Sequence, residues 1–241
     1  VDSTTREVQD GAGKNTSIAL SDDGLQVKPQ TDNTTGTFIV KNASGSTIFS
    51  VDTVNNQVLA GSTQLPVNQH YMYFSATRIT PVADTHMLIP LLTSNPFGSG
   101  SDHLVEQNLG SGADPTTSLD LSAQDDSVYL SPYYWYVPDA IKIVAVNVVV
   151  GGSQSSGDTL GFHLMKYTLD ISSNFGDLSS GVVVADGGTM NDANEDKILV
   201  SSLSINSSNS SVSSGKVLLL TVESDSTDDI SVNATIKYNI T

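Results

Sequence analysis

The chain contains no cysteine among its 241 residues. A disulfide scaffold, a thiolate metal site and a cysteine nucleophile are therefore excluded. Histidine is also scarce. The four histidines, His70, His86, His103 and His163, are too far apart in the sequence to match a metal-binding spacing. We expect them in loops or on strand faces, and we predict no cofactor.

Basic residues are few as well. The chain has 10 Lys and Arg against 26 Asp and Glu, which gives a formal net charge of −16. Most of this excess lies in residues 76–241, which hold 19 acidic and 6 basic residues. A surface of this sign repels nucleic acid and anionic lipid. Neither is expected as a partner.

Long apolar runs are missing too. No stretch approaches the ~18 apolar residues that a membrane-spanning helix needs. The first residues, VDSTTREVQDGAGK, lack the basic and apolar regions of a secretion signal. We therefore expect no membrane insertion, and a protein that either stays where it is made or leaves as part of an assembly.

Good helix formers are also rare, whereas Gly, Ser, Thr, Asn and Asp are abundant. This composition favours an all-β fold with short strands and polar loops. Alternating or continuous apolar runs predict strands in the C-terminal part at 87–92, 128–137, 141–150, 160–165, 198–205, 217–222 and 230–240. Within the first of these, Pro90 predicts an edge strand or a bulge. Residues 93–126 read as a long polar loop.

The clearest local pattern lies at residues 37–61, which read TFIVKNASGSTIFSVDTVNNQVLAG. Apolar residues alternate on both sides of a turn rich in Asn, Ser and Gly, and a second turn follows at Asn55-Asn56. The pattern predicts strand, turn, strand, turn, strand.

An isolated meander of this size is marginal in water. Its apolar contacts therefore come either from the rest of one monomeric domain or from identical chains around an axis. For the second alternative we predict a three-fold seam formed by Phe38, Ile39, Ile48, Phe49 and Val51.

The run FIVKNASGSTIFSVDTVNNQVLAG resembles the β-stalk repeats of tailed-bacteriophage fibres and other virion appendage proteins. Three later segments resemble the head domains of marine phage virion proteins: WYVPDAIKIVAVNV, GDTLGFHLMK and DDISVNATIKYNI. The resemblance implies a homotrimer with an intertwined β-hairpin stalk and a C-terminal β-sandwich head of the jelly-roll type. The expected organisation is a stalk and attachment region at 1–61, an aromatic transition segment at 62–75 and the head at 76–241. The first strand of the head is the alternative for 62–75.

Candidate chemistry in the chain is weak. Acidic residues cluster at Asp125-Asp126, at Asp192, Glu195 and Asp196, and at Asp225, Asp228 and Asp229. We expect solvated loop carboxylates, with Ca²⁺ at the second cluster as the hypothesis to test. Two carboxylates ~5–9 Å apart can hydrolyse glycosides, but no pair is singled out. No Gly-x-Ser-x-Gly elbow is present either. We therefore predict no enzyme, and no catalytic or metal site.

An aromatic run, Tyr133, Tyr134, Trp135 and Tyr136, precedes a strongly predicted strand. Such residues serve as core, as subunit interface or as a stacking surface for a glycan.

The sequence and the resemblance together predict a structural protein of a bacteriophage virion, assembled in the host cytoplasm. Its expected partners are its own copies, other virion proteins of the capsid or tail, and a host cell-surface glycan if the head binds the host. A tail fibre with a receptor-binding loop at 93–126 and a head fibre or capsid decoration remain alternatives. The alternatives from other classes are a tail-associated glycan-binding or glycan-degrading protein and a secreted carbohydrate-binding module.

Overall fold

The computed structural model describes residue 4 and residues 6–9, 11–21, 24–55, 57–61, 63–64, 69–91, 109–119, 133–152, 157–172, 177–191 and 197–241. All the regular structure in these residues is β-strand, so the predicted all-β class is confirmed. In this described part, no helix is long and apolar enough to cross a membrane. The chain divides into two units, Val1–Asn68 and Gln69–Thr241.

The first unit consists of two small antiparallel sheets. One sheet has the order β1-β2-β3 and the other the order β4-β5-β6-β7. The strands are β1 (Arg6–Gln9), β2 (Asn15–Leu20), β3 (Leu25–Val27), β4 (Phe38–Lys41), β5 (Thr47–Asp52), β6 (Gln57–Ala60) and β7 (Thr63–Gln64). The meander predicted within residues 37–61 is confirmed as strands β4, β5 and β6.

The second unit contains two larger sheets. The first has the order β14-β11-β18-β8, and the short β16 also pairs with β11; the second has the order β10-β17-β12-β13-β15, and β9 also pairs with β17. The strands are β8 (Gln69–Ile79), β9 (Met87–Ile89), β10 (Tyr134–Tyr136), β11 (Ile141–Gly152), β12 (Thr159–Asp170), β13 (Asp177–Asn191), β14 (Ile198–Ser202), β15 (Ser204–Ile205), β16 (Ser211–Val212), β17 (Lys216–Ser224) and β18 (Ile230–Ile240). All strand pairings among the described residues of this unit are antiparallel.

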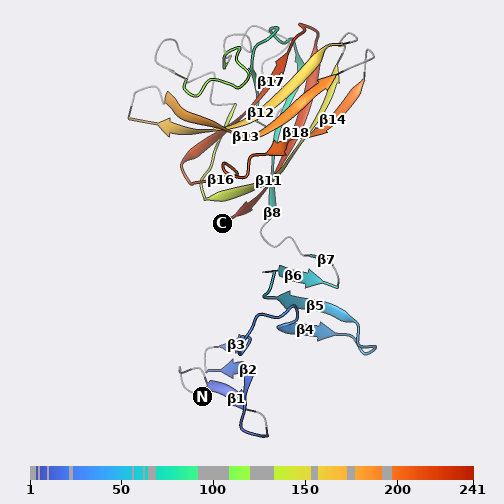
Figure 1. Cartoon of the computed structure of the whole chain (residues 1–241), viewed down its shortest axis with the longest axis vertical. Helices are drawn as coiled ribbons and strands as arrows, with labels where there is room; N and C mark the ends of the chain where they lie inside the picture. The colour runs from blue at the N-terminus through green and yellow to red at the C-terminus, as the bar shows by residue number, and fades with distance from the viewer. Residues whose placement is uncertain are drawn as a thin grey trace. The chain divides into compact units, whose positions relative to one another are not determined.

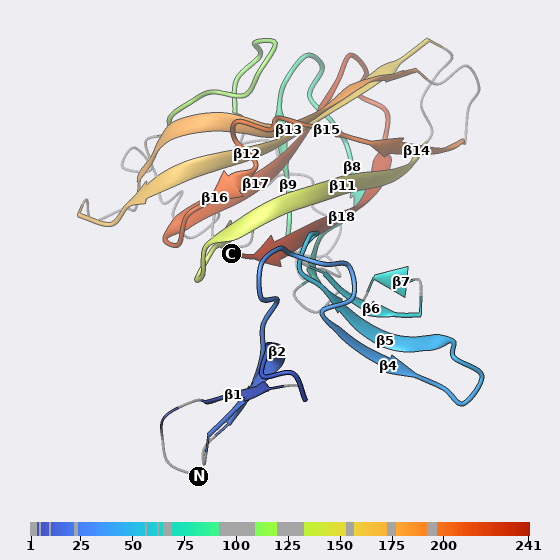
Figure 2. The same ribbon diagram turned by 60° about the horizontal axis from the view of Figure 1, so that its bottom comes forward.

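These two sheets enclose the main hydrophobic core. Figure 2 shows β12, β13 and β17 in one layer and β11 and β18 in the other. One continuous cluster of buried side chains draws on both layers, including Phe74 from β8, Val148 from β11, Phe162 from β12 and Ile236 from β18. Figure 1 labels these strands along the chain. Because both layers share this core, it determines which face of each long strand points inward.

A second, smaller core lies on the other side of the β17–β12 sheet. It contains Leu88, Leu109, Tyr167 and Leu219, all of which are at most 1% exposed. Residues 109–119 cover it: the Tyr167 hydroxyl donates a 2.6 Å hydrogen bond to the Thr116 carbonyl oxygen. Burial raises the pKa of Tyr167 far above its usual value, so this hydroxyl stays a donor at physiological pH.

Several strand predictions in this unit are confirmed. Strand β18 covers the alternating run at 230–240, and β11 covers the run at 141–150 and lies inside its sheet. Strand β9 ends before Pro90 and pairs with β17 alone. This is the edge position that proline requires.

Other predictions need correction. The long strand β13 was not predicted at all. The single strand predicted at 198–205 is two strands, β14 and β15, which pair with different sheets on either side of the buried Leu203. The chain changes sheets there, and periodicity does not reveal such a crossing. Residues 69–75 belong to β8, which pairs with β18. The structure therefore agrees with the alternative prediction for this aromatic segment, in which it forms the first strand of the second unit.

Candidate functional site

The meander of the first unit has one face made wholly of apolar side chains. Directly paired residues on neighbouring strands point to the same face. The register pairs Phe38 with Val51 and Val40 with Phe49, and it continues from β5 to β6. The face therefore contains Phe38, Val40, Phe49, Val51, Val58 and Ala60, and we call it the apolar stalk face.

This apolar stalk face has no layer packed on it within the described part of its own unit. Phe38 is 41% exposed and Val40 is 42% exposed. The rings of Phe38 and Phe49 meet edge to face with centroids 6.1 Å apart, but neither side chain is buried. Among the described residues of the first unit, Ala19 is the only buried hydrophobic side chain. The unit thus has almost no core of its own.

The opposite face of the meander is different. Ile39 pairs with Ser50, and Ser50 pairs with Leu59. On this face Ser50 is only 6% exposed, and a side chain placed at Gly36 would meet Ile39 Cδ1 at 2.4 Å. The same chain thus covers Ser50, but Ile39 remains 44% exposed, about as much as Phe38 and Val40 on the apolar stalk face.

The structure consequently divides the residues predicted for the seam. Phe38, Phe49 and Val51 lie on the apolar stalk face, whereas Ile39 lies on the opposite face. Ile48 falls at the register shift between β4 and β5 and has no cross-strand partner that assigns it to a face. Consecutive residues of a strand cannot share a face, so one flat seam cannot contain all five.

Side-chain hydrogen bonds fix both turns of the meander. Asn42 Oδ1 accepts the N–H groups of Ser44 and Ser46 at 3.1 and 2.9 Å. At the second turn, the Asp52 carboxylate accepts the side-chain N–H of Asn55 at 2.7 Å and its backbone N–H at 2.9 Å. These bonds, the side-chain one first, lower the pKa of Asp52. The register that forms the apolar stalk face is thereby set locally.

The aromatic run of the second unit is also divided between two faces. Tyr134 and Trp135 pair with consecutive residues of β17, so they point in opposite directions. Trp135 packs on the main core, with its ring centroid 4.9 Å from that of Tyr238. Tyr134 packs on the smaller core. Tyr133 is 8% exposed and Tyr136 is 51% exposed. The run therefore offers solvent one largely exposed ring, not four.

Two histidines that the sequence keeps far apart meet in the structure. The rings of His86 and His163 lie edge to face with centroids 5.0 Å apart, and their exposed fractions are 0% and 8%. His86 Nε2 lies 2.7 Å from the Gly112 carbonyl oxygen, and a carbonyl only accepts, so this nitrogen carries the proton. Both Nδ1 atoms are buried without a hydrogen-bond partner among the described residues.

Acidic groups surround this histidine pair. Asp114 Oδ1 lies 3.7 Å from His163 Nε2, and Glu223 Oε2 lies 3.8 Å from His86 Nε2. Burial and the neighbouring His86 lower the pKa of His163, while Asp114, Asp186 and Glu223 oppose that shift. No sequence pattern indicates this pair, because β12 and the segment before β9 are distant in the chain and are brought together by the pairing of β12 and β9 with β17.

The predicted calcium ligands Asp192, Glu195 and Asp196 lie outside the described residues, as do Asp125-Asp126 and His103. Of the loop predicted at 93–126, the structure describes residues 109–119. In the third acidic cluster, Asp225 Oδ1 accepts the Thr159 N–H at 2.7 Å, and Asp229 pairs with Arg78. No group of three His, Asp or Glu side chains within the described ranges is arranged to hold a metal ion.

The chain matches no protein-family model, and no curated protein is significantly similar to it. The function is therefore argued from the residues and their geometry.

Proposed function

We propose that this chain is a structural protein of a bacteriophage virion. It forms a homotrimeric fibre or decoration, with the first unit as the stalk and the second unit as a jelly-roll head. Its partners are two further copies of itself and a capsid or tail protein that holds the stalk. The role is structural rather than enzymatic.

One observation carries the assembly. The apolar stalk face presents six apolar side chains from three strands, while the described part of its unit buries only one hydrophobic side chain, that of Ala19. Fully burying a side chain of this kind contributes about 1.5–3 kcal/mol. A monomer leaves that contribution unused, whereas copies packed face to face around an axis gain it. The number three comes from the resemblance of residues 38–61 to phage stalk repeats.

The strand order supports a jelly-roll head. We count β8, β9 with β10, β11, β12, β13, β14, β17 and β18 as successive strands and treat β15 and β16 as short additions. One sheet then holds the first, eighth, third and sixth strands, and the other holds the second, seventh, fourth and fifth. This order is that of two Greek keys wound into a jelly roll.

Mass in solution tests the assembly directly. Light scattering on the full chain is expected to give three times the protomer mass of 25.3 kDa. A 25.3 kDa species at micromolar concentration would overturn the proposal.

Two neighbouring substitutions test which face forms the seam. Val40→Lys places a charge on the apolar stalk face and is expected to dissociate the assembly, because burying an unpaired ammonium costs several kcal/mol. Ile39→Lys is the matched control, since Ile39 is 44% exposed on the opposite face. It should keep the assembled mass. Dissociation by Ile39→Lys alone would show that the seam lies on the opposite face and not on the apolar stalk face.

Negative-stain images of virions labelled on this chain would separate the two versions of the proposal. Label on the capsid supports a decoration, and label on the tail supports a host-contacting fibre. Release of oligosaccharides from host capsule or lipopolysaccharide by the purified chain would instead favour the glycan-degrading alternative.

A further inference from the structure

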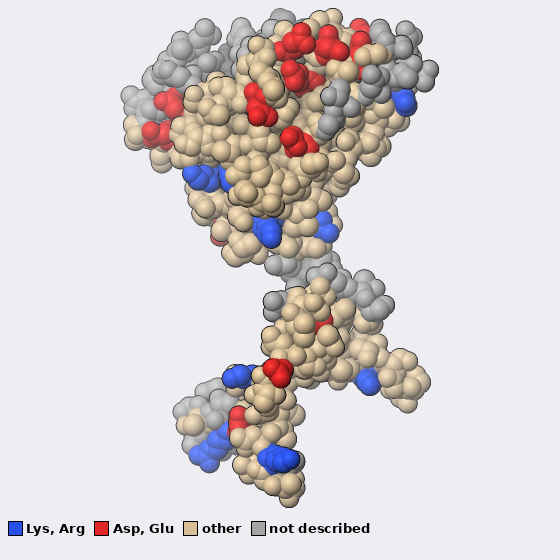
Figure 3. All heavy atoms as spheres, viewed as in Figure 1, with Lys and Arg blue, Asp and Glu red and all other residues tan. Residues whose placement is uncertain are grey.

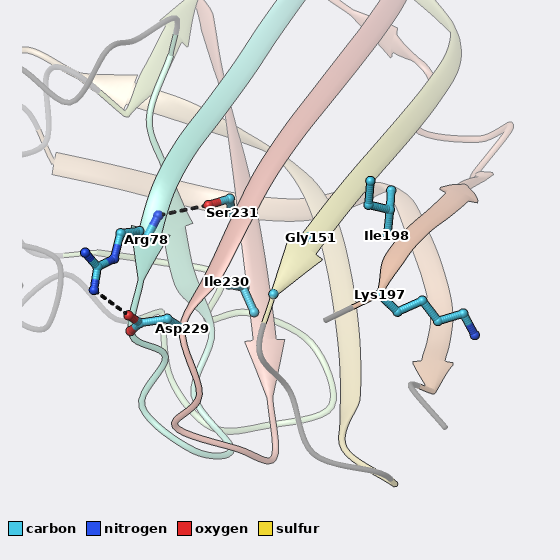
Figure 4. Close-up of a pocket in the computed structure, with 8 residues that line it drawn as sticks. Arg78, Gly151, Lys197, Ile198, Asp229, Ile230 and Ser231 are labelled. Atoms are coloured by element: carbon cyan, nitrogen blue, oxygen red, sulfur yellow. Dashed lines mark hydrogen bonds and ion pairs between the residues drawn. The ribbon is translucent and has the colours of Figure 1, made fainter. Parts of the chain in front are cut away.

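A shallow depression of about 500 Å³ lies at one end of the β14-β11-β18-β8 sheet of the second unit. Figure 4 shows its lining side chains, with Gly151 between Arg78 on one side and Lys197 on the other. Ile198, Ser231 and Asp229 also line it. Its volume is within the range of small-ligand sites, which is about 300–1,000 Å³.

A glycine without a packing role keeps this depression open. In the register, Gly151 pairs with Ile198 on one side and Ser231 on the other. A Cβ atom built on Gly151 would have no heavy atom within 4 Å, and the backbone there does not need glycine. The next residue contrasts with it, because a Cβ on Gly152 would lie 2.8 Å from the Asp229 carbonyl oxygen. Gly152 serves packing, whereas Gly151 leaves empty space.

Arg78 is held at one rim by a strained backbone. Its φ is 53°, a conformation that is uncommon for residues other than glycine. Its N–H donates to Ser231 Oγ at 3.1 Å, and its guanidinium lies 3.4 Å from Asp229 Oδ2. Thr80 Oγ1 donates to the other oxygen of Asp229 at 2.5 Å. The Arg78 side chain is 80% exposed, so most of its five donors face solvent.

Lys197 stands at the opposite rim and is exposed. Residues 76–241 contain six basic side chains, and two of them line this depression. Lys166 and Lys216 by contrast donate hydrogen bonds within the fold. Three strand spacings separate β14 from β8, so the two rims are about 14 Å apart. The depression thus carries two basic side chains against one carboxylate, that of Asp229, in a strongly acidic molecule.

We propose that this depression binds a linear acidic oligosaccharide whose carboxylate or sulfate groups pair with Arg78 and Lys197. Its sugar rings lie over Gly151 against Ile198, and its hydroxyls bond to Ser231. The shallow floor suits a flat ring better than a peptide side chain, which needs a deeper hole. A nucleic acid is densely negative, so a chain of net charge −16 repels it. The proposal uses the second unit alone and does not depend on trimer formation.

Titration calorimetry on the full chain tests the ligand class. The probes are dextran sulfate and polygalacturonate oligosaccharides, neutral dextran and an oligoglutamate peptide. Binding of an acidic oligosaccharide, none of neutral dextran and weakening from about 0.01 M to about 0.15 M salt are expected, since the screening length falls from about 30 Å to about 8 Å. The better of the two acidic probes identifies the anionic group. Binding of oligoglutamate alone, or of no probe, overturns the proposal.

Three variants test the location. Gly151→Val fills the floor with a residue that strands favour, so it should weaken binding at least about tenfold while leaving the unfolding midpoint unchanged. Lys197→Glu should weaken it as well. Lys142→Glu removes an exposed lysine of β11 outside the depression and is the matched control. Equal effects of Lys142→Glu and Lys197→Glu, or unchanged binding in Gly151→Val, would place the site elsewhere. A monomeric chain that still binds would contradict the trimer and leave this site standing.

Discussion

At the residue scale, the buried histidine pair shows how environment overrides sequence spacing. His86 anchors residues 109–119 through its ring and through two backbone hydrogen bonds, to Gly110 and from Leu109. His163 lies against it in the middle of β12. An imidazole that is buried in this way is easier to keep neutral than charged. Burial lowers the pKa of His163 in the same way.

We predict that the second unit loses stability as the pH falls below the ordinary histidine value of 6.5. Burial, and then His86, lower the pKa of His163 in the folded state. The unfolded chain therefore takes up the proton first, and the stability present above pH 6.5 is lost as the pH falls towards the folded pKa. The carboxylates of Asp114, Asp186 and Glu223 offset part of this loss.

Urea unfolding at about pH 7.5 and about pH 5.5 measures this effect, because histidine titrates between them. His163→Gln keeps a neutral polar group at the site. The difference between its urea midpoints at the two pH values should be smaller than that of the natural chain. An identical pH dependence in both proteins would exclude His163 as the source.

At the element scale, strands with clean alternation were predictable and strands with interruptions were not. Strand β18 alternates without a break and was found from the sequence. Strand β13 was missed, although at 15 residues it is the longest. Its sequence, DLSSGVVVADGGTMN, contains three glycines, and its pairing with β12 shifts register three times. Each shift breaks the two-residue period that the prediction relies on.

Gly181, one of the glycines that interrupt the strand pattern of β13, is required by its packing. A Cβ on Gly181 would lie 2.4 Å from Tyr167 Cε1 and 3.0 Å from Thr117 Cα. Tyr167 is fully buried and hydrogen-bonded to Thr116, so its ring has little room to move.

We therefore predict that Gly181→Ala destabilises the second unit by about 1–3 kcal/mol, the usual cost of overpacking. Gly151→Ala is the matched control on a strand of the other sheet, where a Cβ meets open space. It should leave stability unchanged or raise it by up to about 1 kcal/mol. Urea unfolding of both variants gives the comparison. An equal loss in the free energy of unfolding of both variants would show that the ring of Tyr167 moves to make room for the added methyl group.

The candidate site was predictable only as far as local pattern reaches. The strands of the meander follow from alternation, and its turns follow from the run at 42–46 and from Asn55-Asn56. The part played by Asp52 in the second turn and the close approach of Gly36 to Ile39 come from chain folding that periodicity does not encode. The histidine pair and the depression beside Gly151 likewise depend on pairings between distant strands.

At the scale of the whole chain, the two units differ in how they bury apolar side chains. The second unit has two cores, whereas the described part of the first has one buried hydrophobic residue, Ala19. Charge is also uneven. On the face in Figure 3, most acidic side chains of the second unit gather towards one end, and most of its basic side chains lie nearer the other. The second unit thus has the cores that an independent domain needs, whereas the described residues of the first unit form no comparable core.

We predict that fragments 69–241 and 1–68 behave differently. The larger fragment should unfold cooperatively, because its cores lie within the fragment. The smaller should fold only with copies of itself, so its urea midpoint should rise with concentration. For a trimer, each tenfold rise in concentration adds about 2.8 kcal/mol to the free energy of unfolding per trimer, which is twice the 1.4 kcal/mol of one association step. Circular dichroism over a range of concentrations measures both midpoints. A 1–68 fragment that is folded as a single copy in dilute solution would show that its exposed strands need no partner, and the case for a self-assembled stalk would fail with it.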